Sequence, residues 1–419
     1  MSVDLVVIGL GYVGLPLVQG ATRAGMSVVG LDVSQPVVDG LNAGTSHIDD
    51  LSDGDMAEIL GSGFRATTDP AVLAEANTAV ICVPTPLSED GGPDLTAVMS
   101  AVEMCADSLH HGQLIVLEST TYPGTTDEIV LPLLESDGMR AGEDFFLAFS
   151  PERIDPGNPT YGLKNTPKVV GGHSPRCTDR AADFYGQFID EVVRTRGTRE
   201  AEMAKLLENT YRHINIALVN EMARFCHELG IDLWDVVGAA KSKPFGFQAF
   251  YPGPGVGGHC IPIDPNYLSY KVRAQLGYPF RFVELAQEIN QGMPSYVVNR
   301  AQDLLNEVGK PLQGSRVVLL GVTYKPDIAD QRESPARPVA RILQDKGAQV
   351  VYNDPHVERW LVNGTSVERV EDLEGGLADA DLVVLLQNHS QYDLASIAAA
   401  APLMLDTRGA VPGDVAARL

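Results

Sequence analysis

The sequence predicts an α/β protein with two Rossmann-like, doubly wound parallel-sheet domains joined by a long central helix. Three observations carry this prediction. Apolar strand-like runs alternate with helical segments in the first third of the chain, which is the pattern of a parallel sheet covered on both faces. The segment 199–229 then contains neither Gly nor Pro. After residue 315 the alternation of strands and helices begins again.

The first domain is expected to span residues 1–198. "DLVVIG" is an all-apolar run of the kind buried in a parallel sheet, "LPLVQGATRAG" follows it as a helix, and "SVVGLD" is the next strand. Further strands are expected at Thr78–Pro84, Gln113–Thr120 and Phe145–Ser150.

The second domain, 199–310, is expected to be helical and to begin with the segment that lacks Gly and Pro. A helix of roughly 30 residues is about 45 Å long, which is more than one domain needs. We therefore expect it to bridge domains and to supply a dimer face. Its apolar positions are Met203, Leu206, Leu207, Ile214, Leu218 and Met222.

The third domain, 311–419, follows a boundary near "EVGKPLQGS" (307–315). Its expected strands are "RVVLLG", "AQVVYND", "DLVVLL" and "PLMLDTRG". Because it has no GxGxxG motif, it is expected to bind something other than a second whole dinucleotide in the usual way.

Composition limits the partners and the location. The formal net charge of −24 argues against nucleic acid. No apolar run approaches the ~18 residues of a membrane span, and the first run contains Asp4 with no basic stretch before it, so it is no signal peptide. We expect a cytoplasmic protein. The cysteines are odd in number and form no CxxC, so no disulfide framework or metal site is expected, and four should be packing residues: Cys82, Cys105, Cys177 and Cys226.

The motif "GLGYVG" follows the first strand and opens a helix, which predicts a dinucleotide site. Its glycines permit a tight turn, close approach of a pyrophosphate, and packing of the helix on the strand. A carboxylate at the end of the second strand accepts from ribose hydroxyls and repels a 2′-phosphate, which selects NAD over NADP. The alternative is that the glycines serve packing alone. The expected cofactor residues are Gly9, Gly11, Tyr12, Val13, Gly14 and Asp32.

Three later strand ends carry polar turns: "VPTP" with Thr85, "ESTTYPGTT" with Thr120, and "FSPERIDPGN" with Glu152, Arg153 and Asp155. Carboxyl ends of parallel strands form the ligand crevice. Turns rich in Pro and hydroxyl groups are also ordinary loop chemistry. The residues leave both interpretations open for the first two turns, and position favours the crevice for the third.

On the long helix, Glu202, Lys205 and Asn209 share one face, roughly opposite the apolar stripe. The pattern alone favours a solvated polar face. The alternative is a lysine that stabilises a developing oxyanion.

The stretch "YPGPGVGGHCIPIDP" places Cys260 behind a run of glycines. Either the loop is a tight turn with Cys260 as filler, or it presents the thiol. His259 is not expected to pair with its neighbour, because adjacent side chains on an extended backbone point apart. Asp264 could fold back toward the sulfur.

Taken together, the chain resembles the UDP-glucose/GDP-mannose dehydrogenase family. "GLGYVGLP", "EMAKLLENTYRHINIALVNE", "PGPGVGGHCIPIDP" and "GVTYKPDIADQRESP" stand in the family's order and spacing. The resemblance implies oxidation of C6 of a nucleotide sugar from alcohol to acid by two hydride transfers to NAD. It implies that Cys260 forms a thiohemiacetal and then a thioester, which water hydrolyses.

The resemblance also implies residue roles. Lys205 and Asn209 would stabilise the oxyanion, Asp264 would handle protons through a water, and Thr120 would lie near the nicotinamide. Glu152 matches the first of two family glutamates, and the second falls on Pro156. The hydrolysis base is thus either Glu152 or Asp264.

The C-terminal domain would hold UDP. The resemblance places Lys325 and Arg408 on the substrate and Arg332 near the cofactor, and passes the loop 251–257 over the sugar. The full expected set of substrate residues is Glu152, Arg153, Lys205, Asn209, Tyr251, Gly253, Gly257, Lys325 and Arg408.

Within the family, "KPFGFQAFYPGPGVGGHCIPIDP" is most similar to the branch that acts on UDP-N-acetylglucosamine, in surface polysaccharide synthesis. UDP-N-acetylmannosamine and UDP-glucose are the alternatives. Lys241 and Lys243 stand where the UDP-glucose branch often has an arginine, which weakens the case for glucose. Two other classes remain as rivals: a two-electron β-hydroxyacid dehydrogenase and a non-catalytic NAD-binding sensor. A homodimer or higher homo-oligomer is expected.

Overall fold

The computed structural model describes residues 3–48, 51–88, 92–155, 158, 160–258 and 261–419. It separates into two compact units. The first comprises Met1–Glu208 with Asn266–Gly277, and the second comprises Asn209–Pro265 with Tyr278–Leu419. The division into three domains stays a prediction.

The first unit contains an eight-stranded sheet in the order β3-β2-β1-β4-β5-β6-β7-β8. The first six strands follow the 3-2-1-4-5-6 order of a doubly wound dinucleotide fold. All neighbours are parallel except β6 and β7. The strands are β1 Val3–Ile8, β2 Val28–Leu31, β3 Arg65–Thr67, β4 Ala76–Ile81, β5 Leu114–Leu117, β6 Phe146–Phe149, β7 Lys168–Gly172 and β8 Val192–Arg194.

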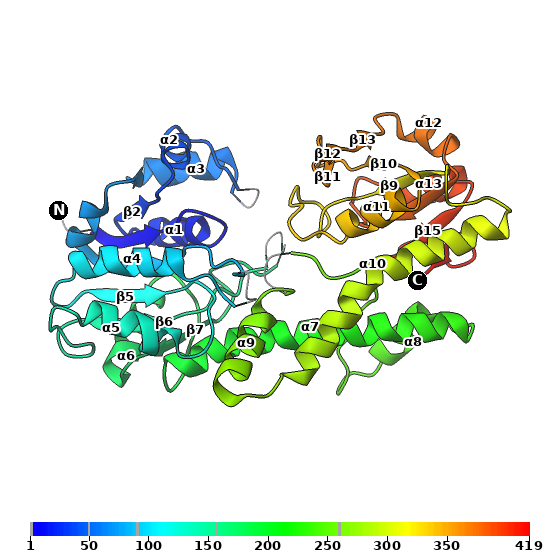
Figure 1. The fold of residues 1–419 in the computed structure, drawn as a ribbon. Helices are drawn as coiled ribbons and strands as arrows, with labels where there is room; N and C mark the ends of the chain where they lie inside the picture. The colour runs from blue at the N-terminus through cyan, green and yellow to red at the C-terminus, as the bar shows by residue number, and fades with distance from the viewer. Residues whose placement is uncertain (1–2, 49–50, 89–91, 156–157, 159, 259–260) are drawn as a thin grey trace. The chain divides into compact units, whose positions relative to one another are not determined.

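Side chains of β1 alternate between two cores, because successive strand residues face opposite sides of the sheet. Leu5 and Val7 belong to one core, and Val6 and Ile8 to the other. The first core is covered by α1 Gly14–Arg23, α2 Gln35–Asn42, α3 Asp53–Gly61 and α6 Pro175–Tyr185. The second is covered by η1 Pro70–Glu75, α4 Thr96–Asp107, η2 Thr126–Val130 and α5 Leu131–Leu134 (Figure 1). The doubly wound prediction is confirmed.

The second unit contains a six-stranded parallel sheet in the order β13-β10-β9-β14-β15-β16. Its strands are β9 Arg316–Leu320, β10 Gln349–Asn353, β13 Glu368–Arg369, β14 Leu382–Leu385, β15 Met404–Asp406 and β16 Ala417–Arg418. A small antiparallel pair joins β11 Leu361–Val362 and β12 Thr365–Ser366. One face is covered by α10 Arg281–Glu307 and α11 Ala336–Asp345, and the other by α12 Leu373–Ala378 and α13 Leu394–Ala400.

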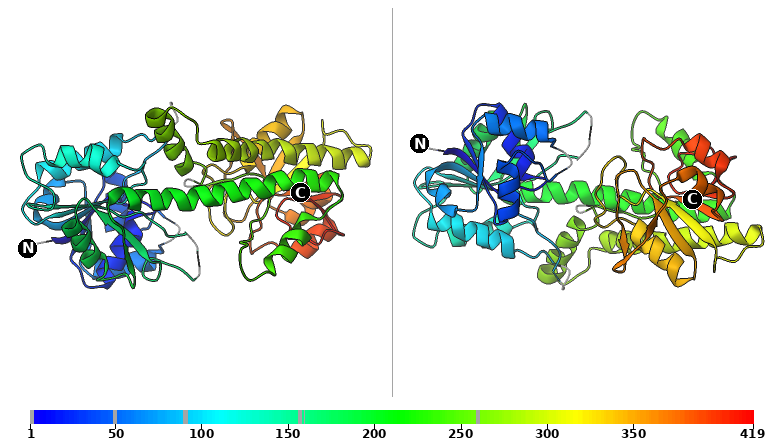
Figure 2. Two further views of the ribbon diagram at one scale, coloured as in Figure 1. Left: turned by 90° about the horizontal axis from the view of Figure 1, so that it is seen from below. Right: turned by 90° about the horizontal axis from the view of Figure 1, so that it is seen from above.

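The predicted long helix is α7, which spans Thr198–Glu228. Figure 2 shows it as one unbroken helix. Its N-terminal part belongs to the first unit and the remainder to the second. The predicted apolar stripe divides in the structure: Leu206 is buried, whereas Met203, Leu207 and Leu218 are exposed.

The remaining helices are α8 Leu233–Lys241 and α9 Asp264–Leu276. Among the described residues, none of the helices has the length and apolarity that crossing a membrane requires.

Candidate functional site

The dinucleotide motif occupies the turn from β1 into α1. Gly9 has a φ of 93°, and a Cβ there would lie 2.8 Å from the carbonyl oxygen of Cys82. A Cβ on Gly14 would lie 1.9 Å from the Gly9 oxygen, whereas Gly11 has open space around it. Gly9 and Gly14 are therefore fixed by packing, and Gly11 leaves a bare stretch of backbone at the sheet's switch point.

Asp32 follows β2, and its carboxylate binds the backbone of the turn after β1 and of the turn after β2. One carboxylate oxygen accepts from the Leu10 N–H at 2.9 Å, and the other accepts from the Ser34 N–H at 2.9 Å. Each oxygen of an ionised carboxylate has a second lone pair. The side chain, which is only part-buried, can therefore still accept from the hydroxyls of a ribose.

The loops after β4 and β5 are tied together by threonines. The Thr85 hydroxyl donates to the Thr120 carbonyl oxygen at 2.8 Å, and the Tyr267 hydroxyl donates to the Thr85 carbonyl oxygen. Thr85 is buried and Thr120 is half-buried. Tyr267, on α9, was not predicted from the sequence, since an isolated tyrosine in a helix carries no motif.

A buried lysine links two of the strand ends. Lys168, at the start of β7, has its Nζ 3.0 Å from Glu118 Oε1 and 3.7 Å from Glu152 Oε2. Tyr185 also donates to Glu118. Burial raises the pKa of Glu118. Burial alone would lower the pKa of Lys168, but the two carboxylates outweigh it and raise that pKa. The network therefore places a fixed cation beside the Glu152 carboxylate, a feature that sequence reasoning missed.

The polar side chains of α7 are buried, so the interpretation as a solvated face is wrong. Glu202, Lys205 and Asn209 are 1%, 8% and 6% exposed. Loss of water forces each to find a partner in the protein. Lys205 Nζ donates to the carbonyl oxygen of Glu152.

Glu202 binds the loop that follows Thr120. Its carboxylate accepts from the Gly124 N–H at 2.5 Å, the Thr126 N–H at 2.9 Å and the Thr126 hydroxyl at 2.7 Å. Burial outweighs these bonds and raises the pKa of Glu202 to about 7.

The structure also brings together Asn209 and Asp264, two residues that were predicted separately. Asn209 Nδ2 donates to Asp264 Oδ2 at 2.6 Å, and Asp264 is 2% exposed at the start of α9. The predicted nucleophile Cys260, and its neighbour His259, lie outside the described residues. The described cysteines are free and buried, as expected of packing residues: Cys82, Cys105, Cys177 and Cys226.

The glycine loop before Cys260 needs its bare backbone. A Cβ on Gly257 would lie 2.7 Å from the Tyr324 Cβ, and one on Gly253 would lie 3.1 Å from Arg408 Nη1. The Gly253 N–H donates to Asn220 Oδ1 at 2.9 Å. The loop thus passes directly over the predicted substrate residue Arg408, and Tyr251 stacks on Trp234 with ring centroids 5.7 Å apart.

Three predicted arginines have protein partners. Arg153 pairs with Glu208 at 2.7 Å and donates to the Pro167 carbonyl oxygen. Arg332 pairs with Asp330 at 2.6 Å. Arg408 Nε donates to the Leu386 carbonyl oxygen at 2.6 Å. A guanidinium has five N–H donors, so each of these arginines can keep its protein partner and still bind a ligand.

The doubly wound sheet, the glycine turn after β1 and Asp32 define a dinucleotide-binding fold, and a second parallel sheet follows it in the chain. Three models of one family match the chain: the NAD-binding domain of the UDP-glucose/GDP-mannose dehydrogenase family over residues 3–189, its central domain over 199–292, and its UDP-binding domain over 318–413. The chain belongs to this family. It is an NAD-dependent nucleotide-sugar dehydrogenase.

Named relatives cover nearly all of the chain. It is 34% identical over 400 residues to UDP-N-acetyl-D-mannosamine dehydrogenase of Escherichia coli K12, spanning 92% of this chain and 93% of that one. It superimposes on a UDP-D-ManNAc dehydrogenase from Pyrococcus horikoshii with a TM-score of 0.88, at 31% identity, over 98% and 96% of the two chains.

A UDP-glucose dehydrogenase from Pyrobaculum islandicum gives a TM-score of 0.86 at 28% identity, over 100% and 97% of the two chains. The relatives named for N-acetylmannosamine favour UDP-N-acetylmannosamine, which the sequence left open as an alternative, over UDP-N-acetylglucosamine.

Replacing the buried lysine tests the network beneath Glu152. Lys168→Met leaves two buried carboxylates without their cation, so we expect a loss of about 3–5 kcal/mol in the free energy of unfolding. Arg196→Met is the control, because it removes an exposed i,i+4 ion pair with Glu200 and should cost about 0.5 kcal/mol or less. Chemical unfolding measures both. Equal losses in the two variants would contradict the assignment of a structural cation.

Glu202 should make stability depend on pH. Its folded pKa of about 7 lies above the ordinary 4.5, so the folded state retains a proton that the unfolded state releases. The resulting stabilisation is complete below pH 4.5 and is lost as the pH rises through 7. Relative to Glu202→Gln, the wild type should lose up to about 3 kcal/mol between pH 4.5 and pH 7.5. Parallel stability curves for the two proteins would show that Glu202 has an ordinary pKa.

Proposed function

We propose that this chain oxidises C6 of UDP-N-acetylmannosamine from the alcohol to the carboxylic acid, with reduction of two NAD⁺. The observation that carries the proposal is the likeness, over more than nine-tenths of the chain, to relatives named for this sugar nucleotide. UDP-N-acetylglucosamine, favoured by the loop before Cys260, becomes the second candidate substrate.

The buried pairs support a division of labour. When bound, NAD⁺ accepts a hydride from C6 in each of the two oxidations. Lys205 has three donors, of which the Glu152 carbonyl uses one, so the ammonium can also stabilise an alkoxide at C6. Asn209 donates one amide hydrogen to Asp264 and retains a second. Both groups are held in place before the substrate arrives.

Cys260 is assigned the covalent step. Its sulfur adds to the C6 aldehyde to give a thiohemiacetal, and the oxyanion takes up a proton. Loss of a hydride and a proton leaves a thioester. Water then adds to the thioester carbonyl, and the carboxylic acid and the free thiol are released. A neighbouring carboxylate must accept the proton of that water.

The sugar preference is tested with a substrate panel. We expect kcat/KM for UDP-N-acetylmannosamine to exceed the values for UDP-N-acetylglucosamine and UDP-glucose by at least about tenfold, or about 1.4 kcal/mol in transition-state binding. NADH absorbance gives the rates, and the three sugars serve as one another's controls. A higher value for UDP-N-acetylglucosamine would return the assignment to the second candidate.

The hydrolysis base is Glu152 or Asp264, and a burst experiment separates them. A variant without the base should complete both hydride transfers and then stall as the thioester. We therefore expect either Glu152→Gln or Asp264→Asn to give a burst of two NADH per active site followed by slow turnover. Rapid quenching with protein mass analysis detects the acyl-enzyme. If neither variant accumulates it, hydrolysis does not depend on these carboxylates.

We further propose a homodimer through α7. Tyr211, Leu218 and Phe225 stand seven residues apart, so they lie on one face of the helix, and they are 45%, 53% and 45% exposed. An apolar stripe of this kind marks a protein–protein interface.

Leu218→Glu places a charge in the centre of this stripe and should shift the molar mass, measured by light scattering, from dimer to monomer. Val415→Glu is the control, because Val415 is an exposed residue of the C-terminal sheet region. An unchanged mass for Leu218→Glu would move the interface elsewhere.

A further inference from the structure

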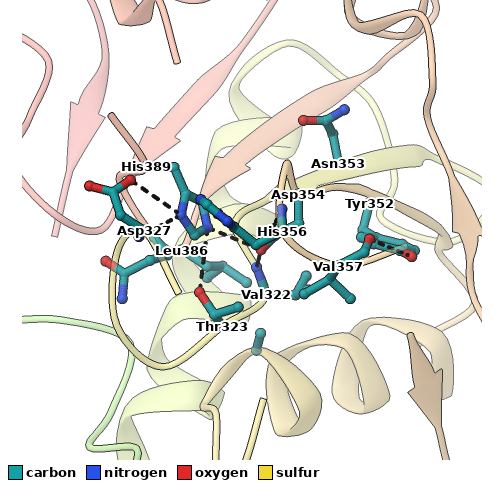
Figure 3. A network of polar contacts seen from close by, with 12 residues as sticks. Val322, Thr323, Asp327, Tyr352, Asn353, Asp354, His356, Val357, Leu386 and His389 are labelled. Carbon is teal, nitrogen blue, oxygen red and sulfur yellow. Dashed lines mark hydrogen bonds and ion pairs between the residues drawn. The ribbon is translucent and has the colours of Figure 1, made fainter. Parts of the chain in front are cut away.

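The segment after β9 is held at both ends by buried side chains. The Val322 N–H donates to Asp354 Oδ2 at 2.7 Å, and the Asp327 N–H donates to His389 Nδ1 at 3.0 Å (Figure 3). Between these points lies Lys325, which is half-buried. Asp354 and His389 are both fully buried. The two anchors therefore define the path of the six-residue segment that carries Lys325.

The tautomer of His389 follows from its partners. Because a backbone N–H points at Nδ1, that nitrogen must be the unprotonated acceptor. The ring proton is then on Nε2, which donates to Asp354 Oδ2 at 3.0 Å. Burial alone would raise the pKa of Asp354, but the bonds from His389 and from backbone N–H groups lower it. Each ring nitrogen thus has a separate task, one toward Asp327 and one toward Asp354.

The backbone at Asp327 shows that this anchor holds the chain in an unfavourable shape. Asp327 has a φ of 62°, the left-handed region that non-glycine residues rarely adopt. Ser390, next to His389, donates its N–H to Asp327 Oδ1 at 2.7 Å. Two bonds from the loop after β14 therefore fix a residue of the loop after β9.

A metal site is the other interpretation of this cluster. Ligand-type atoms of Asp327, His356 and His389 all lie within 4.8 Å of one another. Each is already directed at a protein group, however. His389 Nδ1 faces the Asp327 N–H, and His356 Nε2 faces Gln391 Nε2 at 3.0 Å. The geometry is that of a hydrogen-bonded anchor rather than of a cation site.

The anchor lies at the carboxyl ends of the two strands that flank β9. Asp354 follows β10 and His389 follows β14, which flank β9 on its two sides. The carboxyl ends of strands at such a reversal form the binding crevice of doubly wound sheets. This sheet lies within the family's UDP-binding domain.

We propose that His389 is a positioning residue for UDP-sugar binding: through Nδ1 it fixes Asp327, and so holds the segment that presents Lys325 to the diphosphate. The positioning role of His389 rests on the proposed function, because it assumes that Lys325 contacts UDP.

Two substitutions test the roles of the two ring nitrogens of His389 one at a time. In His389→Asn the side-chain oxygen can replace Nδ1 as the acceptor for Asp327, but the bond to Asp354 is lost. In His389→Gln the amide can replace Nε2 as the donor to Asp354, but the acceptor for Asp327 is lost. A side chain that only stabilised the fold would change stability and affinity together.

The experiment measures UDP binding to the full-length protein by calorimetry and thermal stability by scanning. We expect His389→Gln to weaken UDP binding about tenfold, because the hydrogen bond that fixes Asp327 is lost. Its melting temperature should stay near normal, because the bond to the buried Asp354 is kept. His389→Asn should melt at a lower temperature and bind UDP within about threefold of wild type. In turnover, His389→Gln should raise KM for the UDP-sugar and leave KM for NAD⁺ unchanged.

Two further variants make the outcomes distinct. Tyr392→Phe is the matched control, because it removes a part-buried hydrogen bond beside the His389 ring, to the Asn353 carbonyl oxygen at 2.7 Å, and should leave UDP affinity unchanged. Lys325→Ala tests the assumed contact. If it binds UDP normally, the role of Lys325 is wrong. If it weakens UDP binding but His389→Gln does not, the positioning role of His389 is overturned.

Discussion

The site depends on one constraint, the burial of the polar side of α7. Each polar side chain removed from water there must be paired, and each pair ties the helix to a different loop. Glu202 binds the loop after β5, Lys205 binds the backbone at Glu152, and Asn209 binds Asp264 at the start of α9. Within the first unit, Glu202 and Lys205 stand three residues apart on the helix, so the loop after β5 and the backbone at Glu152 are held at neighbouring points along it. The cost of burying polar groups therefore fixes which loops the helix holds.

Positive charges lie at particular buried positions, although the chain as a whole is negatively charged. The protein carries a formal charge of −24, yet its cofactor and its substrate are anions. Lys168 and Lys205 are nearly inaccessible to water, and both lie against the residue Glu152. Charges in such surroundings are screened less by salt than surface charges are. Lys168 faces two carboxylates, whereas Lys205 donates to a backbone carbonyl oxygen, so Lys205 is the buried cation that we expect to act on a bound anion.

Regular structure was predictable from the sequence because it depends on local periodicity. The five named strands of the first unit and the four of the second appear where apolar runs predict them, and α7 starts and ends within one residue of the segment without Gly or Pro. The short strands β3 and β8 and the strand β7 were not predicted, and neither was the antiparallel pairing of β7 with β6, since pairing direction is a long-range property.

The site was only partly predictable. Motif spacing identified Gly9, Gly14 and Asp32, whose packing and hydrogen bonds fit a dinucleotide loop. The same reasoning misjudged the polar face of α7, because helical periodicity shows which residues share a face and not what covers that face. It also missed Lys168, since a lysine at the start of a strand has no local pattern that reveals two buried carboxylates opposite it. The candidate sugars differ only in a substituent or in the configuration of a ring carbon, and no sequence motif distinguishes such small differences.

The first measurement for a four-electron oxidation in one active site is the number of NADH molecules formed per sugar nucleotide, with UDP-N-acetylmannosamine limiting and NAD⁺ in excess. We expect two, because the aldehyde is held until the thioester has formed and been hydrolysed. A value of one, with free aldehyde in solution, would contradict it and would place this chain among two-electron dehydrogenases.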